Sequence, residues 1–225
     1  MKYSNEIKRV GHPRNDIFFE DIQKYRDKIV KILNIDKAAK IALYMPTYRN
    51  SLADFYYDLD FEILKNTLKQ RFGGDWIILI RSHNFNLSKN IFKDKLAFDV
   101  SFYPDSQELL ASADVLISDY SSCMFDYLLT KKPCFVYAKD VEEYQIERGL
   151  YYSFSETPFL VSKNNVELQN NILNFNDEEY KNKCIEFLEK KELFEDGKSS
   201  FRVVEIIKNM VNNEIQISWN YFEDF

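Results

Sequence analysis

Residues 115–126 read Val-Leu-Ile-Ser-Asp-Tyr-Ser-Ser-Cys-Met-Phe-Asp, and their pattern indicates the fold class. Its first three residues are apolar, as in a buried strand, and a polar turn then leads into a predicted helix at 122–130. A strand that passes directly into a helix is the repeating unit of an α/β sheet. The turn itself has two interpretations. Either Ser121 or Ser122 caps the helix, or the turn holds an anion such as the phosphates of a nucleotide.

The same order of strand and helix extends in both directions from this stretch. We expect strands at 40–45, 76–80, 97–102, 115–118 and 133–138, and a weak one at 159–161. We expect helices at 17–33, 58–72, 105–113, 122–130 and 141–148, and further helices from 164 to 213. The strands are apolar runs without alternation, which indicates a parallel sheet covered on both faces. The predicted fold class is α/β, a doubly wound, Rossmann-like sheet with a helical C-terminal end.

Three segments are expected within this fold. Residues 1–39 form a lead-in turn and helix, 40–163 form the Rossmann-like core, and 164–225 form C-terminal helices that pack on the core. The N-terminus lacks the apolar region of a signal peptide, and no apolar run reaches the length of a membrane span. We therefore expect a cytoplasmic protein that can rest on a membrane surface.

The composition excludes several classes of function. A formal net charge of -6 argues against a broad nucleic-acid-binding surface. The three cysteines have no metal-binding spacing and there are two histidines, so we expect no metal site and read the cysteines as structural thiols. The chain contains neither a G-x-G-x-x-G nor a Walker A sequence, which leaves NAD and P-loop nucleotides unsupported.

Polar residues gather directly after the predicted strands. Ligands of doubly wound sheets bind beyond the carboxyl ends of the strands, so these segments are where a site is expected. They are 46–50, 81–84, 103–106, 119–122 and 139–140. Their polarity, with a histidine and several charges, predicts a binding site at this edge of the sheet.

Individual side chains in these segments each have two interpretations. His83 beside Arg81 is suited to phosphate binding or proton transfer, or it is a surface histidine that hydrogen-bonds a loop. Thr47 and Arg49 follow a strand in the same way, and arginine is the side chain best matched to phosphate. A solvated loop arginine is nevertheless the commoner case.

Two further positions have weaker signals. Glu143 can hold ribose hydroxyls, with Arg148 nearby, but an acidic run is more often the solvated first turn of a helix. His12 lies between Gly11 and Pro13 in a turn, and we favour a structural role for it.

Six segments, taken together and in order, resemble the motifs of one family. They are 11–16 (G-x-P-R-N-D), 43–49 (Y-x-P-T-x-R), 81–83 (R-x-H), 114–126 (D-x-L-I-T-D-Y-S-S-x-x-F-D), 140–151 (D-x-x-x-Y…R-G-x-Y) and 196–203 (D-G-x…R-V). The family is that of the CDP-glycerol glycerophosphotransferases, the teichoic acid and capsule polymerases. The resemblance covers about residues 10–208, nearly the whole chain.

The resemblance implies a fold, a reaction and a location. The chain is expected to be the C-terminal, nucleotide-binding half of a GT-B architecture. The implied enzyme transfers alditol phosphate from CDP-glycerol or CDP-ribitol to a polymer or lipid-linked acceptor and releases CMP, without a cofactor or an obligatory metal. It would act at the inner face of the cell membrane as a peripheral protein.

The resemblance also implies roles for named residues. His83 would contact the donor diphosphate and stabilise or protonate the leaving CMP. Ser121 and Ser122 would hold the diphosphate, and the nearby side chains would be Arg81, Thr47 and Arg49. Glu143 and Arg148 would lie near the cytidine.

One departure from the family keeps other functions open. Ten residues precede Gly11 and they contain no histidine, whereas the family has an H-G-T-P-like segment upstream and an acceptor-binding half. A partner polypeptide would then supply that half, or the chain is a fragment. The alternatives are a non-catalytic nucleotide-binding module that regulates or assembles a polymerase, and a GT-B glycosyltransferase that uses a nucleotide sugar.

Overall fold

The computed structural model describes residues 8–47, 58–82 and 97–220, with side chains up to residue 212. The chain forms two compact units. The larger is Ile22–Lys191, and the smaller combines Met1–Asp21 with Glu192–Phe225. The larger unit includes three helices from outside the segment 40–163, and the predicted three-part division of the chain stays a prediction. The three helices are α1 (Gln23–Leu33), α6 (Asn165–Leu173) and α7 (Asp177–Lys190).

The larger unit is built on a six-stranded sheet in which every neighbouring pair is parallel. The strand order is β3-β2-β1-β4-β5-β6. The strands are β1 (Lys40–Met45), β2 (Trp76–Ile80), β3 (Ala97–Asp99), β4 (Val115–Ser118), β5 (Cys134–Tyr137) and β6 (Leu160–Ser162). This arrangement confirms the predicted doubly wound α/β fold.

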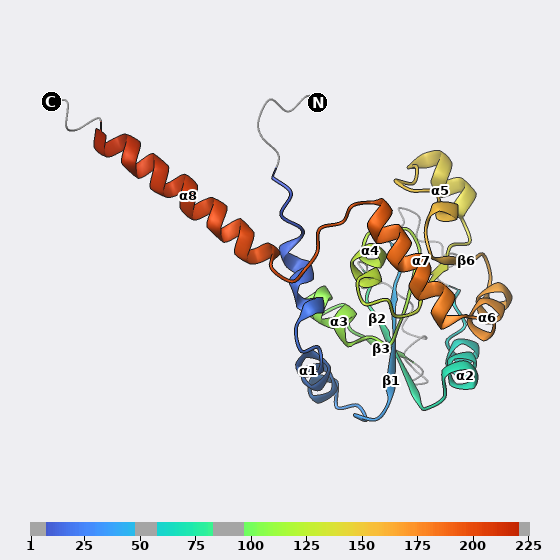
Figure 1. Cartoon of the computed structure of the whole chain (residues 1–225). Coiled ribbons are helices and arrows are strands. Elements are labelled where there is room, and N and C mark those ends of the chain that lie inside the picture. The colour runs from blue at the N-terminus through green and yellow to red at the C-terminus, as the bar shows by residue number, and fades with distance from the viewer. Residues whose placement is uncertain (1–7, 48–57, 83–96, 221–225) are drawn as a thin grey trace. The chain divides into compact units, whose positions relative to one another are not determined.

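Helices cover both faces of the sheet. Helices α1 and α3 (Ser106–Ser112) pack together on one face, and α2 (Phe61–Phe72) packs with α6 on the opposite face (Figure 1). Two short helices, α4 (Cys123–Leu128) and α5 (Val141–Glu147), follow β4 and β5, and a 3-10 turn, η3, spans Phe154–Glu156.

The burial of successive strand residues shows that both faces are covered. Ile41, Ala42 and Leu43 of β1 all have 0% exposure, although adjacent strand residues point to opposite faces. Burying a side chain such as Ile41 or Leu43 contributes about 1.5–3 kcal/mol to folding. The unbroken apolar runs in the sequence are the cause of this two-sided burial.

The strand order reverses between β1 and β4. From β1 the chain proceeds to β2 on one side, whereas β4 is followed by β5 on the other side. The register pairs Met45 with Ser118, so the segments that follow these two strands begin side by side. In sheets of this type, the crevice at such a reversal is where ligands bind.

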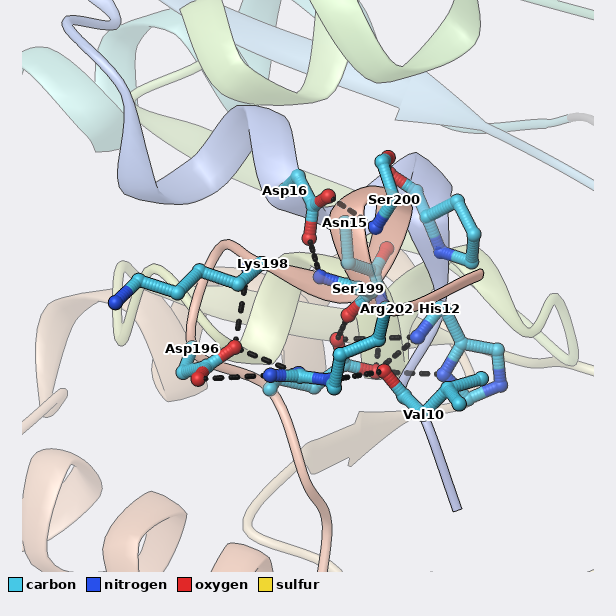
Figure 2. Close-up of polar contacts among 11 residues, drawn as sticks. Val10, His12, Asn15, Asp16, Asp196, Lys198, Ser199, Ser200 and Arg202 are labelled. Carbon is cyan, nitrogen blue, oxygen red and sulfur yellow. Dashed lines mark hydrogen bonds and ion pairs between the residues drawn. The ribbon is translucent and has the colours of Figure 1, made fainter. Parts of the chain in front are cut away.

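The smaller unit consists of the 3-10 helix η1 (Pro13–Phe19) and the 22-residue helix α8 (Ser199–Asn220). Asp16 caps α8, because its carboxylate accepts hydrogen bonds from the backbone N–H groups of Ser199 (2.9 Å) and Ser200 (2.7 Å) (Figure 2). The Glu195 side chain is 3% exposed and lies 2.6 Å from Nδ1 of His12. His12 thus has a structural contact, as expected.

Two glycines allow these segments to meet. Gly11 has φ +80°, and a Cβ there would lie 2.3 Å from Ser199 Oγ. Gly197 has φ +76°, and a Cβ there would lie 2.6 Å from Phe19 Cβ. The first and last of the six motifs are therefore parts of one structural cluster, although their contacts join residues 183 positions apart.

The predicted helix boundaries fail at both ends of the chain. The single helix expected at 17–33 is instead η1 followed by α1, because the first segment is held by its contacts with α8. The helical region after residue 164 is broken twice. Asn176 caps α7 through a bond from the N–H of Glu179, and Gly197 has a left-handed φ just before α8.

Candidate functional site

A cavity of about 200 Å³ lies beyond the carboxyl ends of the first four strands of the sheet. It is lined by Met45, Pro46, Thr47, Arg81, Ser82, Ser101 and Ser121. The lining comes from the segments after β1, β2, β3 and β4, which is the edge that the sequence predicts. Pockets that enclose a whole drug-sized ligand measure roughly 300–1,000 Å³, so this volume fits one polar part of a ligand.

The side of the cavity at β1 and β4 is fixed by Asp119, which is 4% exposed. Its Oδ1 atom accepts hydrogen bonds from the Thr47 backbone N–H (2.9 Å), the Thr47 hydroxyl (2.5 Å) and the Tyr120 backbone N–H (2.7 Å). Ser118 adds a second connection, because its hydroxyl donates to the Met45 carbonyl at 2.6 Å. The segments after β1 and β4 are therefore joined directly.

These bonds limit what Thr47 can do. A threonine has one backbone N–H and one hydroxyl hydrogen, and both are donated to Asp119 here. Thr47 lines the cavity as expected, yet it has no hydrogen for a phosphate oxygen in this arrangement. Its predicted contact with a diphosphate stays a prediction, and the observed contact is one that positions the loop.

Arg81 supplies the positive charge of the described lining. Its backbone N–H donates to the Tyr44 carbonyl at 2.9 Å, which continues the ladder between β2 and β1 past the end of the strand. Its guanidinium donates to the Tyr103 carbonyl and is thereby held at the cavity. Next to it, Ser101 Oγ accepts a bond from the Ser82 N–H at 2.9 Å. An arginine among hydroxyl groups is suited to bind a phosphate.

The two adjacent serines of the turn have different positions. Ser121 lines the cavity, and its Oγ atom accepts a long bond of 3.4 Å from the Cys123 N–H. Ser122 stands at the N-cap of α4 but makes no side-chain cap bond, is exposed and does not line the cavity. Helix α4 has six residues, so the site rests on Arg81 and Ser121 more than on a helix dipole.

Of the other predicted site residues, some lie outside the described residues and two are described but stand away from this cavity. Arg49 and His83 lie outside the described residues, and their predicted roles stay predictions. Glu143 and Arg148 are exposed on and next to α5, and neither lines the cavity. The Arg148 guanidinium lies 5.8 Å from the centre of the Tyr144 ring.

Two aromatic residues near the turn have roles that the sequence did not suggest. Tyr120 and Tyr144 stack with their ring centres 3.7 Å apart and their planes 10° apart. The Tyr120 hydroxyl donates to Asp140 at 2.8 Å. These contacts fasten the turn after β4 to the segment after β5. The tyrosine of D-Y-S-S was a visible signal, but its stacking partner lies in a segment that is distant in the sequence.

Neither a reactive thiol nor a metal cluster is found in the described ranges. Burial raises the pKa of the Cys123 thiol to about 11, so this cysteine stays protonated beside the turn at neutral pH. The described side chains, which extend to residue 212 in the last range, include no group of histidine, cysteine and acidic residues placed to hold a metal ion. None of the helices in the same ranges combines the length and apolar character that a membrane span requires.

Comparison with known proteins identifies relatives along nearly the whole chain. The model of the family described as CDP-Glycerol:Poly(glycerophosphate) glycerophosphotransferase matches residues 2–209. The teichoic acid poly(glycerol phosphate) polymerase of Bacillus subtilis (strain 168) is 33% identical over 92% of this chain and 29% of its own length. The teichoic acid ribitol-phosphate primase of Bacillus spizizenii is 32% identical over 92% of this chain and 54% of its own length.

Solved structures give the same result. The wall teichoic acid polymerase TagF matches with a TM-score of 0.72 and 30% identity over 92% of this chain and 52% of that chain. A TagF variant soaked with CDPG matches with a TM-score of 0.73 and 29% identity, over 93% of this chain and 53% of that chain. The present chain therefore spans about half of the solved TagF chain, and 29% and 54% of the two curated relatives named here.

Proposed function

Because the chain belongs to the CDP-glycerol:poly(glycerophosphate) glycerophosphotransferase family, we propose that it is the donor-binding part of an alditol-phosphate transferase. Its ligand would be CDP-glycerol or CDP-ribitol. The observation that carries this proposal is the cavity at the strand-order reversal, which places Arg81 and Ser121 together. The relatives are named for both glycerol phosphate and ribitol phosphate, so the family supports either alditol.

The proposed reaction transfers the alditol phosphate and releases CMP. An acceptor hydroxyl oxygen bonds to the phosphorus that bears the alditol, while the bond from that phosphorus to the oxygen bridging to CMP breaks. The acceptor proton passes to a base, and the bridging oxygen leaves on CMP. Arg81 would neutralise charge that grows on this oxygen, and Ser121 would donate to the diphosphate. We propose His83 as the group that contacts or protonates the leaving CMP.

The acceptor in this proposal is a teichoic-acid or capsule polymer, or its lipid-linked start. In-line transfer requires donor and acceptor to be held together, and the chain spans about half of the relatives' length. We therefore propose that a further polypeptide portion, in the same or a separate chain, supplies the acceptor site. The reaction would take place at the inner face of the cell membrane.

The second candidate function is donor binding without transfer. The chain would then bind a CDP-alditol without transferring it, as a module that regulates or assembles a polymerase. Assaying CMP release from CDP-glycerol with a polymer acceptor and the acceptor-binding portion of a relative separates the two. Release that depends on the present chain excludes the module, whereas donor binding without release in this mixture supports it.

The test of donor binding is calorimetric titration of the chain with CDP-glycerol, CDP-ribitol and UDP-glucose. We expect at least one CDP-alditol to bind more tightly than UDP-glucose. Arg81→Ala should raise the Kd about 100-fold, because one charge-assisted contact to phosphate is worth up to about 3 kcal/mol. A folded wild-type chain that binds neither CDP-alditol contradicts the proposal, and tighter binding of UDP-glucose favours a glycosyltransferase.

A further inference from the structure

We propose that Asp119 is a positioning residue of this site. It sets the distance between Thr47 and Ser121, and the donor phosphate lies between these two residues. The inference rests on the proposed function. Asp119 does not line the cavity, and it acts through the groups it holds. Thr47 and Ser121 belong to different segments, after β1 and after β4, so a contact is needed that fixes one segment against the other.

The hydrogen bonds of Asp119 fix the two segments against each other. One carboxylate oxygen receives three donors, two from Thr47 and one from Tyr120, and the other oxygen lies 3.1 Å from the Thr47 N–H. Tyr120 directly precedes Ser121, so a carboxylate bonded to the Tyr120 N–H also fixes the path of the backbone into Ser121. Hydrogen bonds to an ionised carboxylate are about twice as strong as neutral ones.

The charge of Asp119 makes this role testable by its sign. A carboxylate near a phosphate opposes phosphate binding by Coulomb repulsion, and removing its charge should tighten binding if the field alone mattered. If Asp119 acts by positioning, removing its charge weakens the bonds to Thr47 and Tyr120 and binding becomes weaker. The two explanations therefore predict opposite changes in Kd.

Asp114 offers a matched control at the other end of the same strand. It precedes β4, and its carboxylate accepts a bond from the Ile41 N–H of β1 at 2.8 Å. It also accepts one from Arg26 Nη1 at 2.9 Å. Asp114 and Asp119 thus both join the segment of β1 to the segment of β4, at opposite ends of this strand pair. Asp114→Asn weakens the strand pair without touching the cavity.

The experiment is calorimetric titration of the full chain with CDP-glycerol, with thermal unfolding of each variant. We expect Asp119→Asn to raise the Kd about tenfold, the equivalent of one lost charge-assisted bond. Asp114→Asn should lower the Tm and leave the Kd within about twofold of wild type. An Asp119→Asn variant that binds as tightly as wild type, or more tightly, overturns the inference. Equal losses of affinity in both variants also overturn it.

A second variant carries the test if Asp119→Asn does not fold. Thr47→Val keeps the shape of the side chain and removes the hydroxyl that donates to Asp119. We expect a Kd about threefold to tenfold higher. Where Asp119→Asn also folds, the two changes should not add in the double variant, because they remove the same bond. Unchanged affinity in Thr47→Val, or additive losses, contradicts the inference. If the folded wild type binds no CDP-alditol, the proposed function fails as well.

Discussion

The two ends of the β1–β4 strand pair use the same residue type for different purposes. At the amino end, Asp114 faces Arg26, whose guanidinium also donates to the carbonyls of Ala39 (2.6 Å) and Ser112 (3.0 Å). At the carboxyl end, Asp119 accepts hydrogen bonds from uncharged groups of Thr47 and Tyr120. The guanidinium of Arg81 is held at the cavity by the Tyr103 carbonyl.

The amino end also has a cavity, of about 170 Å³, with two cations near it. Lys132 Nζ donates to the Ala113 carbonyl at 2.8 Å, and Arg26 donates to Ser112, so both cations satisfy carbonyls at the C-terminus of α3. A cation that already donates to the carbonyls of a helix end has few hydrogen-bond donors available for a ligand. The partners of a charge, more than its presence in a pocket, therefore distinguish an end of the strand pair that stabilises the fold from an end that binds a ligand.

The largest expected effect is a loss of stability from a change at the amino end of the β1–β4 strand pair. Arg26→Met should lower the free energy of unfolding by about 2–3 kcal/mol, because it removes the partner of Asp114 and leaves carbonyls of the α3 end unpaired. Urea unfolding followed by circular dichroism measures this loss. The Kd for CDP-glycerol should stay within about twofold, and a tenfold rise would contradict the assignment of this end as structural.

A smaller effect is expected from the serine pair at the carboxyl end. Ser121→Ala should raise the Kd for CDP-glycerol about tenfold, since Ser121 lines the cavity and one bond to a charged group is worth about 1.5 kcal/mol. Ser122→Ala is the matched control, because Ser122 is exposed and outside the lining. Calorimetric titration of both variants with CDP-glycerol gives the two Kd values. Equal losses of affinity would show that Ser122 also contacts the donor.

The smallest expected effect is a pH dependence of stability at the amino end. Burial lowers the pKa of Lys132 below its usual value of 10.5. Between the lowered folded pKa and 10.5 the unfolded chain binds more protons, so this group makes stability rise as pH increases through that window. Lys132→Met should remove this rise. Urea unfolding of both proteins across the alkaline range tests it, and identical pH slopes would contradict the prediction.

Most of the fold follows from the sequence. Three of the six strands were predicted to the residue and the other three within three residues, because unbroken apolar runs are the direct cause of burial on both faces. The edge that carries the cavity follows from the parallel sheet alone. Thr47, Arg81 and Ser121 line the cavity, and their predicted contacts with a donor stay predictions. Local patterns suffice where the determining contacts are local or arise from the sheet itself.

The failures concern contacts between residues far apart in the sequence. The sequence shows Thr47 as a hydroxyl near the site but cannot show that its hydrogens are donated to Asp119, 72 positions away. The same holds for the capping of α8 by Asp16, at a separation of 183, which replaced the expected long helix at 17–33. Ser121 and Ser122 are alike by pattern, and only the backbone geometry of the turn separates them.

We propose that the carboxyl end of the β1–β4 pair binds the CDP-alditol and that the amino end stabilises the fold. The decisive experiment is titration of wild type, Arg81→Ala and Arg26→Met with CDP-glycerol under conditions where all three are folded. We expect binding by wild type, a Kd about 100-fold higher for Arg81→Ala, and an almost unchanged Kd for Arg26→Met. Equal affinities for wild type and Arg81→Ala would contradict this proposal.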